Sequence, residues 1–254
     1  MQTWIKYWPT RNTFLAACMV SIAALTPAMV HTAPVSTSEQ QAAQLSPYET
    51  RYEVLRGGSN YGEAVRSLTQ TDDGYKLYTE TEISLLFLSD RRRFWSEFVV
   101  QNGQIKTQLF TYKRSGTGRD KGFSGKFDWQ QQQLINRDTQ QAESADITAH
   151  SMDEAANVEQ LRMDIQNAER SEFVYHVIDE KGQPDELKFR RVGEEVLNLP
   201  YGEVNAVKIE RVREGSKRET DYWFAPELGF VLVKMAQRED GDEVATLQLS
   251  HIQQ

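Results

Sequence analysis

The chain has 254 residues, of which 29 are Lys or Arg, 37 are Asp or Glu and one is Cys. The formal net charge of −8 argues against a nucleic-acid-binding protein and against a protein that lies flat on anionic lipid. A domain of about 220 residues buries roughly 70% of the surface that its unfolded chain exposes, so a core without disulfides is sufficient here.

The first 33 residues have the pattern of a secretory signal peptide. Lys6 and Arg11 form a basic segment, residues 14–30 are mostly apolar, and no acidic residue precedes Glu39. The cleavage site is expected after Ala33, and a second candidate site with a small residue lies at Ala28.

Cys18 lies inside this leader and has two interpretations. Residues 15–18, Leu-Ala-Ala-Cys, fit a lipobox, which would make Cys18 the lipidated N-terminus of an anchored lipoprotein. The apolar run continues past Cys18 to Leu25, which favours an ordinary signal peptide. Loss of the leader leaves no cysteine, which excludes disulfides, thiolate metal sites and a cysteine nucleophile.

Residues 34–46 are rich in Ser, Gln and Ala, and predict a disordered spacer before a single β-rich domain at 47–254. No stretch of the mature chain approaches the ~18 apolar residues of a membrane helix. We therefore expect an exported, periplasmic protein without a transmembrane span.

Alternating apolar and polar residues predict strands through most of this domain. Turn signals separate the strands, among them Asp72-Asp73-Gly74 and Asn102-Gly103. The expected strands cover residues 48–55, 61–71, 75–88, 91–101, 104–114, 119–129, 134–137, 171–179 and 185–199. Between two of them, residues 138–150 are expected to form a loop.

One helix is predicted at about 152–167. Ser151 and Glu154 fit a capping box, with Ser151 as the N-cap. Ala155, Val158, Leu161 and Ile165 follow at helical spacing.

Four further strands follow in succession at 204–213, 217–225, 230–238 and 243–252, and predict a closing antiparallel meander. Strands and helices do not alternate, which argues against a parallel sheet. The sequence therefore predicts a mainly β fold: a single antiparallel, strongly curved sheet or β-barrel, half-barrel-like, with one short helix.

Motifs spread over most of the domain resemble the bacterial exported family known as domain of unknown function 3108 (DUF3108). They are Tyr52-Glu53-Val54, Gly62-Glu63-Ala64, Tyr112-Lys113-Arg114 with Gly116, Arg119-Asp120-Lys121, Phe127-Asp128-Trp129, Gly193-Glu194-Glu195, residues 207–211 and residues 223–229. The resemblance implies an envelope protein and carries no assigned activity, so it transfers no catalytic residues. The form of the sequence also resembles the curved β half-barrels of periplasmic lipoprotein carriers.

Catalytic and metal-binding motifs are absent from the sequence. The mature chain has three histidines, His150, His176 and His251, without a metal-ligand spacing, and it has no G-x-S-x-G elbow or phosphate-binding loop. We therefore expect no catalytic residue, no metal and no cofactor.

Basic residues form two islands in this acidic chain. Strands 91–101 and 104–114 would bring both islands to one end of a meander. The resulting cationic rim would suit a phosphate or carboxylate group of a lipid or glycan. Its candidate residues are Arg91, Arg92, Arg93, Lys113, Arg114, Arg119 and Lys121. Alternatively, these are charges flanking turns and paired with local acids such as Asp90, Glu97 and Asp120.

Aromatic residues are frequent in the expected strands, and they either line an internal cavity or fill the core. The candidate cavity-lining residues are Phe94, Phe98, Phe123, Phe127, Trp129, Tyr222 and Phe224. The leading hypothesis is a non-catalytic envelope protein that binds a lipid or other amphiphile. A protein–protein module in envelope assembly and an enzyme acting on envelope glycan are the alternatives.

Overall fold

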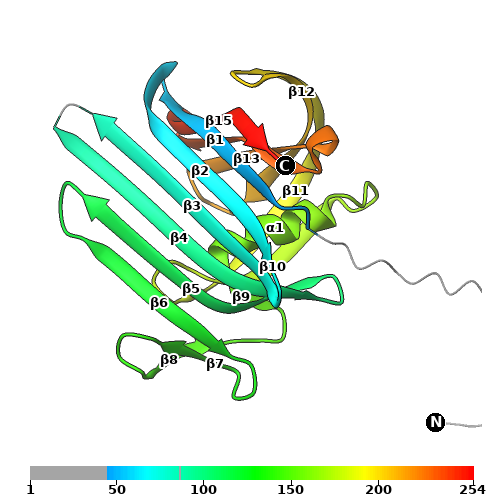
Figure 1. Cartoon of the computed structure of the whole chain (residues 1–254). Coiled ribbons are helices and arrows are strands. Elements are labelled where there is room, and N and C mark those ends of the chain that lie inside the picture. The colour runs from blue at the N-terminus through cyan, green and yellow to red at the C-terminus, as the bar shows by residue number, and fades with distance from the viewer. Residues whose placement is uncertain (1–44, 86) are drawn as a thin grey trace, which may run out of the picture. The chain divides into compact units, whose positions relative to one another are not determined.

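The computed structural model describes residues 45–85 and 87–254. The expected leader, Cys18 and most of the expected spacer lie outside these residues. Within them, 15 strands form one sheet, and one α-helix packs on it (Figure 1). The predicted mainly β fold with one short helix is confirmed.

The N-terminal half of the sheet is a meander in which each strand pairs with the next. Its strands are β1 (Tyr48–Arg56), β2 (Ser59–Thr71), β3 (Gly74–Leu85), β4 (Leu88–Gln101), β5 (Gln104–Gly116), β6 (Lys121–Asp128), β7 (Gln133–Asn136) and β8 (Ala142–Asp146). The tight β4–β5 turn has Asn102 at a φ of 52° and Gly103 at 75°, a backbone that an Asn-Gly pair adopts readily.

The C-terminal half contains the predicted closing meander. Its strands are β9 (Ser151–Asp153), β10 (Glu172–Ile178), β11 (Pro184–Leu199), β12 (Gly202–Val212), β13 (Arg218–Ala225), β14 (Val231–Glu239) and β15 (Asp242–Gln253), with a short 3-10 helix at Pro226–Leu228. β15 pairs with β1 and joins the two halves, and β9 pairs with β10 in parallel.

The sheet is open in the described part of the chain. Its order runs from β8 at one end to β9 at the other, and these two end strands are not paired with each other. The alternative of a closed β-barrel is therefore wrong. Both end strands are short, with five and three residues, and they lie where the sequence predicts a loop and the start of the helix.

α1 (Glu154–Asp164) lies against one face of the sheet and is surrounded by strands of both halves (Figure 1). It contacts β3, β4 and β5 from the first half and β9 and β10 from the second. Because it is covered on several sides, its polar residues Glu159, Gln160 and Arg162 are as buried as Leu161. The apolar periodicity that predicted the helix therefore describes only part of its buried surface.

The predicted helix start is wrong by two residues. Asp153, not Ser151, is the N-cap, and its carboxylate accepts hydrogen bonds from the backbone N–H groups of Ala155 and Ala156. Ser151 belongs to β9, because residues 151–153 continue the sheet beside β10 before the helix begins.

Core packing explains a glycine within the aromatic segment of β6. Gly125 pairs directly with Phe110 of β5, and a Cβ atom on Gly125 would lie 2.7 Å from the Phe110 ring. The glycine therefore leaves the space that this fully buried ring fills.

Leu45, at the edge of the expected spacer, is buried with Tyr48 and Leu68 in the largest core cluster.

Candidate functional site

A row of side chains crosses six neighbouring strands on one face of the sheet. Directly paired residues of antiparallel strands share a face, and the pairing runs without interruption from β1 to β6. The row consists of Tyr52, Ala64, Thr81, Arg92, Arg114 and Lys121. One end of the row is therefore apolar and the other end is cationic.

The apolar end of the row lines a pocket of about 200 Å³ beside α1. Tyr52, Ala64 and Thr81 form one wall. The opposite surfaces come from α1 and from the C-terminal half of the sheet, and include Val158, Leu161, Leu187, Phe189, Tyr222 and Leu232. The pocket is smaller than the 300–1,000 Å³ typical of drug-sized ligand sites, and suits a single slender apolar group.

Two polar side chains of α1 also line this pocket. Asn157 is 1% exposed, and its Nδ2 has no hydrogen-bond partner among the described residues. An unsatisfied buried amide costs roughly 1–3 kcal/mol, so a ligand that supplies an acceptor would be stabilised here. Burial, reinforced by the negative charge of Glu180, raises the pKa of Glu154 to about 7.

The cationic end of the row lines a second cavity of about 540 Å³. Thr81 of the apolar pocket pairs directly with Arg92 of this cavity, so the two spaces adjoin on the same face. Five basic and two acidic side chains line the cavity: Arg92, Arg114, Arg119, Lys121 and Lys181, with Asp120 and Glu180. This charge balance favours an anionic ligand.

Asp90 neutralises part of the cationic cavity. Its carboxylate accepts two hydrogen bonds from Arg92 at 2.8 and 3.1 Å and two from Arg114 at 2.8 and 3.0 Å. Burial alone would raise the pKa of Asp90, but the two guanidinium groups outweigh burial and lower it. One carboxylate thus holds two arginines side by side, and their remaining N–H groups are available to a second anion.

The β10–β11 turn forms the far wall of the cationic cavity. Gly182 of this turn has a φ of 80°, and a Cβ atom there would lie 2.3 Å from the Phe123 ring of β6. Only glycine combines this backbone with this close approach. The contact brings Glu180 and Lys181 into the lining of the cavity that Arg92 and Arg114 also line.

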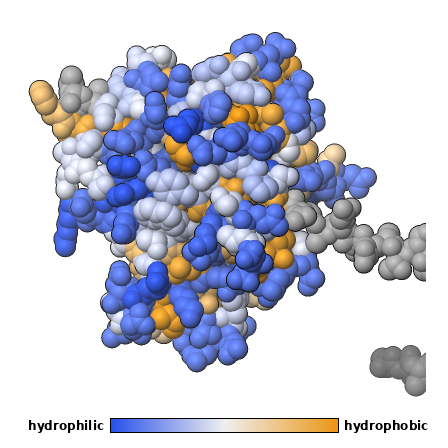
Figure 2. Space-filling model, in the orientation of Figure 1, coloured by the Kyte–Doolittle hydropathy of each residue, from blue (hydrophilic) through white to orange (hydrophobic). Residues whose placement is uncertain are grey.

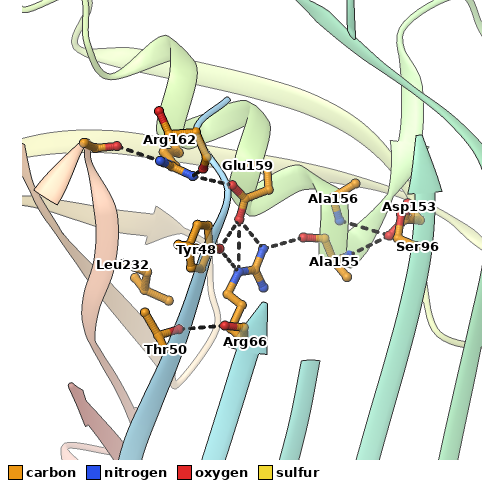
Figure 3. Close-up of polar contacts among 12 residues, drawn as sticks. Tyr48, Thr50, Arg66, Ser96, Asp153, Ala155, Ala156, Glu159, Arg162 and Leu232 are labelled. Carbon is orange, nitrogen blue, oxygen red and sulfur yellow. Dashed lines mark hydrogen bonds and ion pairs between the residues drawn. The ribbon is translucent and has the colours of Figure 1, made fainter. Parts of the chain in front are cut away.

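A buried ion network fixes α1 next to these cavities (Figure 3). Glu159 of α1 accepts hydrogen bonds from Arg66 at 2.9 Å, Arg162 at 3.2 Å and the Tyr48 hydroxyl at 2.5 Å. Burial alone would raise the pKa of Glu159, but the two arginines outweigh burial and lower it. Arg66 also donates to the carbonyl of Ala155, which ties β2 to the first turn of the helix.

The Asp153 cap ties the same helix to β4 and β5. Its second carboxylate oxygen accepts hydrogen bonds from the hydroxyls of Ser96 at 2.5 Å and Thr107 at 2.7 Å. Full burial raises the pKa of Asp153 despite these bonds. Together the two anchors hold the start of α1, with Glu154 and Asn157, against the pocket.

The seven candidate rim residues lie at one end of β4, β5 and β6, but on two faces of the sheet. Arg92, Arg114, Arg119 and Lys121 line the cationic cavity. Arg91, Arg93 and Lys113 alternate with Arg92 and Arg114 along the strands, and therefore point to the opposite face.

On that opposite face, two of these three cations have local partners. Arg91 donates two hydrogen bonds to Glu80, and Arg93 stacks over the Trp95 ring at 5.7 Å.

The candidate cavity-lining aromatics divide in a similar way. Phe123 lines the cationic cavity and Tyr222 the apolar pocket. Trp129 is half-buried, stacks on Phe127 and donates its Nε1–H to the carbonyl of Thr107. The remaining four are at most 8% exposed and fill the core: Phe94, Phe98, Phe127 and Phe224.

His150 and His176 line a separate surface depression beside the end of α1, and His251 is exposed. In the described part of the chain, no group of three or more His, Cys, Asp or Glu residues is arranged to hold a metal ion. No helix there has the length and apolar character needed to cross a membrane.

Sequence reasoning missed the residues that α1 contributes to the pocket. Glu154 was assigned only to a capping box, and Asn157 has no distinctive spacing. Glu180 and Lys181 belong to a turn that only the fold brings to Arg92. The sequence signals for this site are the two basic islands and two of the aromatic candidates, Phe123 and Tyr222.

Solved structures align with most of this chain, and one of them, with a TM-score above 0.5, supports the fold. A β-barrel-like protein of DUF1849 from Brucella abortus aligns with a TM-score of 0.53 at 10% identity, covering 82% of this chain and 98% of that chain. A candidate exported protein with a YmcC-like fold from Bacteroides fragilis aligns with a TM-score of 0.34 at 10% identity, over 83% and 97% of the two chains. A candidate lipoprotein from Parabacteroides distasonis gives 0.32 at 10%, over 83% and 96%.

No curated protein matches the chain. The family model of DUF3108, described as a protein of unknown function, matches residues 48–248, from β1 into β15. This confirms the resemblance of the sequence motifs, and the chain belongs to the DUF3108 family.

Proposed function

We propose that this protein is a non-catalytic envelope protein that binds a single-chain amphiphile with an anionic head group. The apolar chain lies in the pocket beside α1, and the head group lies between Arg92, Arg114 and Lys121. In this proposal the sheet curves around α1, so that both cavities open toward one end.

The observation that carries the proposal is the uninterrupted row from Tyr52 to Lys121. Neighbouring strands are about 4.8 Å apart, so roughly 15 Å separate Thr81 from Lys121. A ligand with an apolar part and a charged part fits this change from apolar to cationic side chains along one line. The two arginines held by Asp90 suit the oxygens of a phosphate or carboxylate.

The pocket volume restricts the ligand class. At about 200 Å³ the apolar pocket admits one chain and excludes the bulk of a two-chain lipid. The unpartnered Nδ2 of Asn157 favours a ligand with a hydrogen-bond acceptor, such as an ester or amide carbonyl, near the start of its chain.

The cellular location is part of the proposal. Residues 1–33 have the form of an export signal, and the family resemblance implied an envelope protein. Osmotic shock should release the protein in the periplasmic fraction, and Cys18→Ser should leave that result unchanged. Retention in the membrane fraction that Cys18→Ser abolishes would instead favour the lipoprotein alternative.

Binding is tested by titration calorimetry with dodecyl phosphate and with dodecyl maltoside, which has the same chain and a neutral head. The wild-type protein should bind dodecyl phosphate in a one-to-one complex and dodecyl maltoside more weakly. The double variant Arg114→Glu/Lys121→Glu should weaken dodecyl phosphate binding at least about tenfold, because it removes charged hydrogen bonds.

The matched control is Arg190→Glu/Arg218→Glu, which reverses two exposed arginines on β11 and β13. It changes the net charge equally and should leave the affinity for dodecyl phosphate unchanged. Absence of binding to the wild type, or equal losses in both double variants, would refute the proposal.

A protein–protein module is the alternative with a physical basis, because an open sheet has edges to which another strand can pair. The two edges here are short, and short edge strands discourage pairing with another chain. A protein that crosslinks to the β8 or β9 edge in cells, together with no amphiphile extracted from the purified protein, would favour that alternative.

A further inference from the structure

The tip of the β3–β4 hairpin exposes two adjacent apolar side chains. Phe87 is 97% exposed and Leu88 is 57% exposed. Figure 2 shows apolar surface projecting from the outline of the molecule at this tip. The other large apolar side chains exposed in the described residues lie apart from one another on strands or turns, and include Val192 and Val196 of β11. Scattered exposed residues are ordinary, whereas an apolar pair at a projecting tip indicates an interaction site.

The loop between β5 and β6 holds this tip in place. The Thr117 N–H donates to the carbonyl of Ser89 at 2.8 Å, and the Thr117 hydroxyl accepts from the Ser89 N–H at 2.9 Å. Gly116 has a φ of 130°, and a Cβ atom there would lie 2.3 Å from the Ser89 carbonyl oxygen. The Phe87 and Leu88 side chains are thus presented beside the loop that carries Arg119.

Basic residues lie behind the tip, and Glu80 and Asp90 neutralise part of their charge. Arg91 and Arg92 follow it on β4, Arg114 ends β5, and Arg119 and Lys121 lie in the adjoining loop and at the start of β6. Apolar side chains at a tip with basic residues behind them match the layers of a bilayer, whose apolar interior lies beneath a surface that anionic lipids make negative.

We propose that the β3–β4 tip docks on the surface of a membrane that contains anionic lipid, with Phe87 and Leu88 inserted and the surrounding cations at the head groups. The overall negative charge still argues against a molecule that lies flat on such a surface. The contact is therefore confined to the tip. This inference goes beyond the proposed binding function, and it places the mouth of the cationic cavity next to the membrane.

Co-sedimentation with lipid vesicles tests the inference, using the exported protein and vesicles of equal parts phosphatidylglycerol and phosphatidylcholine. The wild type should sediment with these vesicles and much less with pure phosphatidylcholine, and added salt should weaken binding. Phe87→Ser/Leu88→Ser should lower partitioning at least about tenfold, because two apolar side chains no longer leave water.

Val192→Ser/Val196→Ser is the matched control, because it removes two exposed apolar side chains from β11. It should sediment as the wild type does. The inference would be overturned if the wild-type protein sedimented with neither vesicle type, or if the tip variant sedimented as well as the wild type does. A tip variant that changes only the oligomeric state in sedimentation velocity would assign the tip to self-association, and would also overturn it.

The two proposals fail separately. The tip variant should still bind dodecyl phosphate with wild-type affinity, since neither Phe87 nor Leu88 lines a cavity. Vesicle binding that depends on the tip, without dodecyl phosphate binding by any form of the protein, would leave the membrane inference standing and refute the ligand proposal.

Discussion

Two carboxylates of the same helix, Glu159 and Glu154, lie in contrasting surroundings. Glu159 accepts hydrogen bonds from Arg66, Arg162 and Tyr48, so the buried charges of the carboxylate and of both arginines are paired. Glu154 lies toward the acidic residues of the β10–β11 turn, and burial with the charge of Glu180 raises its pKa to about 7. The contacts of Glu159 stabilise the fold, whereas the surroundings of Glu154 leave polar groups available to a ligand in the pocket.

The largest effect is expected where the charges are fully paired. Glu159→Ala leaves Arg66 and Arg162 buried without their shared carboxylate, which should cost about 3–5 kcal/mol of unfolding free energy. Urea denaturation measures this loss. Glu210→Ala breaks an exposed pair with Arg190 and should cost less than about 1 kcal/mol. Similar losses in both variants would show that the buried network around Glu159 contributes no more to stability than an exposed ion pair.

The next effect concerns Glu154 and depends on pH. Because the folded protein holds this proton up to a pH of about 7, while the unfolded chain releases it near 4.5, ionisation destabilises the fold as the pH rises through this window. Glu154→Gln should therefore be more stable than the wild type at pH 8, by up to about 3 kcal/mol.

The difference between Glu154→Gln and the wild type should shrink toward zero near pH 4.5, as the wild-type carboxyl becomes neutral. The groups that act on Glu154 are Asp179, Glu180, Asp185 and Arg211, and they are identical in both proteins. Urea denaturation at several pH values measures the difference. A difference that stays constant with pH would show that Glu154 titrates normally.

A smaller effect tests which residue caps α1. Asp153→Ala should cost about 2 kcal/mol, because the helix loses its cap and the Ser96 and Thr107 hydroxyls lose a buried acceptor. Ser151→Ala removes only two local bonds to Thr148 and should cost about half as much. Thermal or urea unfolding measures both losses. A larger loss of stability in Ser151→Ala than in Asp153→Ala would indicate that Ser151 is the cap.

The smallest effect on stability is expected at the cationic cavity. Asp90→Ala breaks ion pairs with half-exposed arginines and should change the unfolding free energy by less than about 1 kcal/mol. The same variant should strengthen dodecyl phosphate binding, because it frees both arginines. Weaker binding would mean that Asp90 acts mainly by orienting the two side chains.

Local patterns were sufficient to predict most strands and the closing meander. Asn102-Gly103 and Asp240-Gly241 adopt the positive φ values that their turns require, and the strands beside them pair as expected. The sequence-based predictions failed where tertiary contacts determine the secondary structure or the burial of a residue. β9 and the start of α1 depend on pairing with β10, and Glu159 and Arg162 are buried because strands from both halves enclose the helix.

The candidate site shows the same contrast between features that local patterns predict and features that depend on tertiary packing. The order of strands β4 to β6 brings Arg92, Arg114 and Lys121 from the two basic islands together, and alternation along the strands turns Arg91, Arg93 and Lys113 to the other face. Asn157, Glu154 and the β10–β11 turn were beyond prediction, because each lies more than 60 residues after Arg92 and reaches the site through packing alone. Most of the aromatic candidates fill the core because their rings pack on one another, as Phe94 does on Phe110.

The central claim is that one ligand occupies both cavities, and the junction at Thr81 tests it most directly. Thr81→Trp places a large ring where the apolar pocket meets Arg92, while Val196→Trp adds the same ring at an exposed position. Calorimetry with dodecyl phosphate should find its affinity at least about tenfold weaker in Thr81→Trp and unchanged in Val196→Trp. Equal affinity for wild type and Thr81→Trp, with both folded, would contradict the claim.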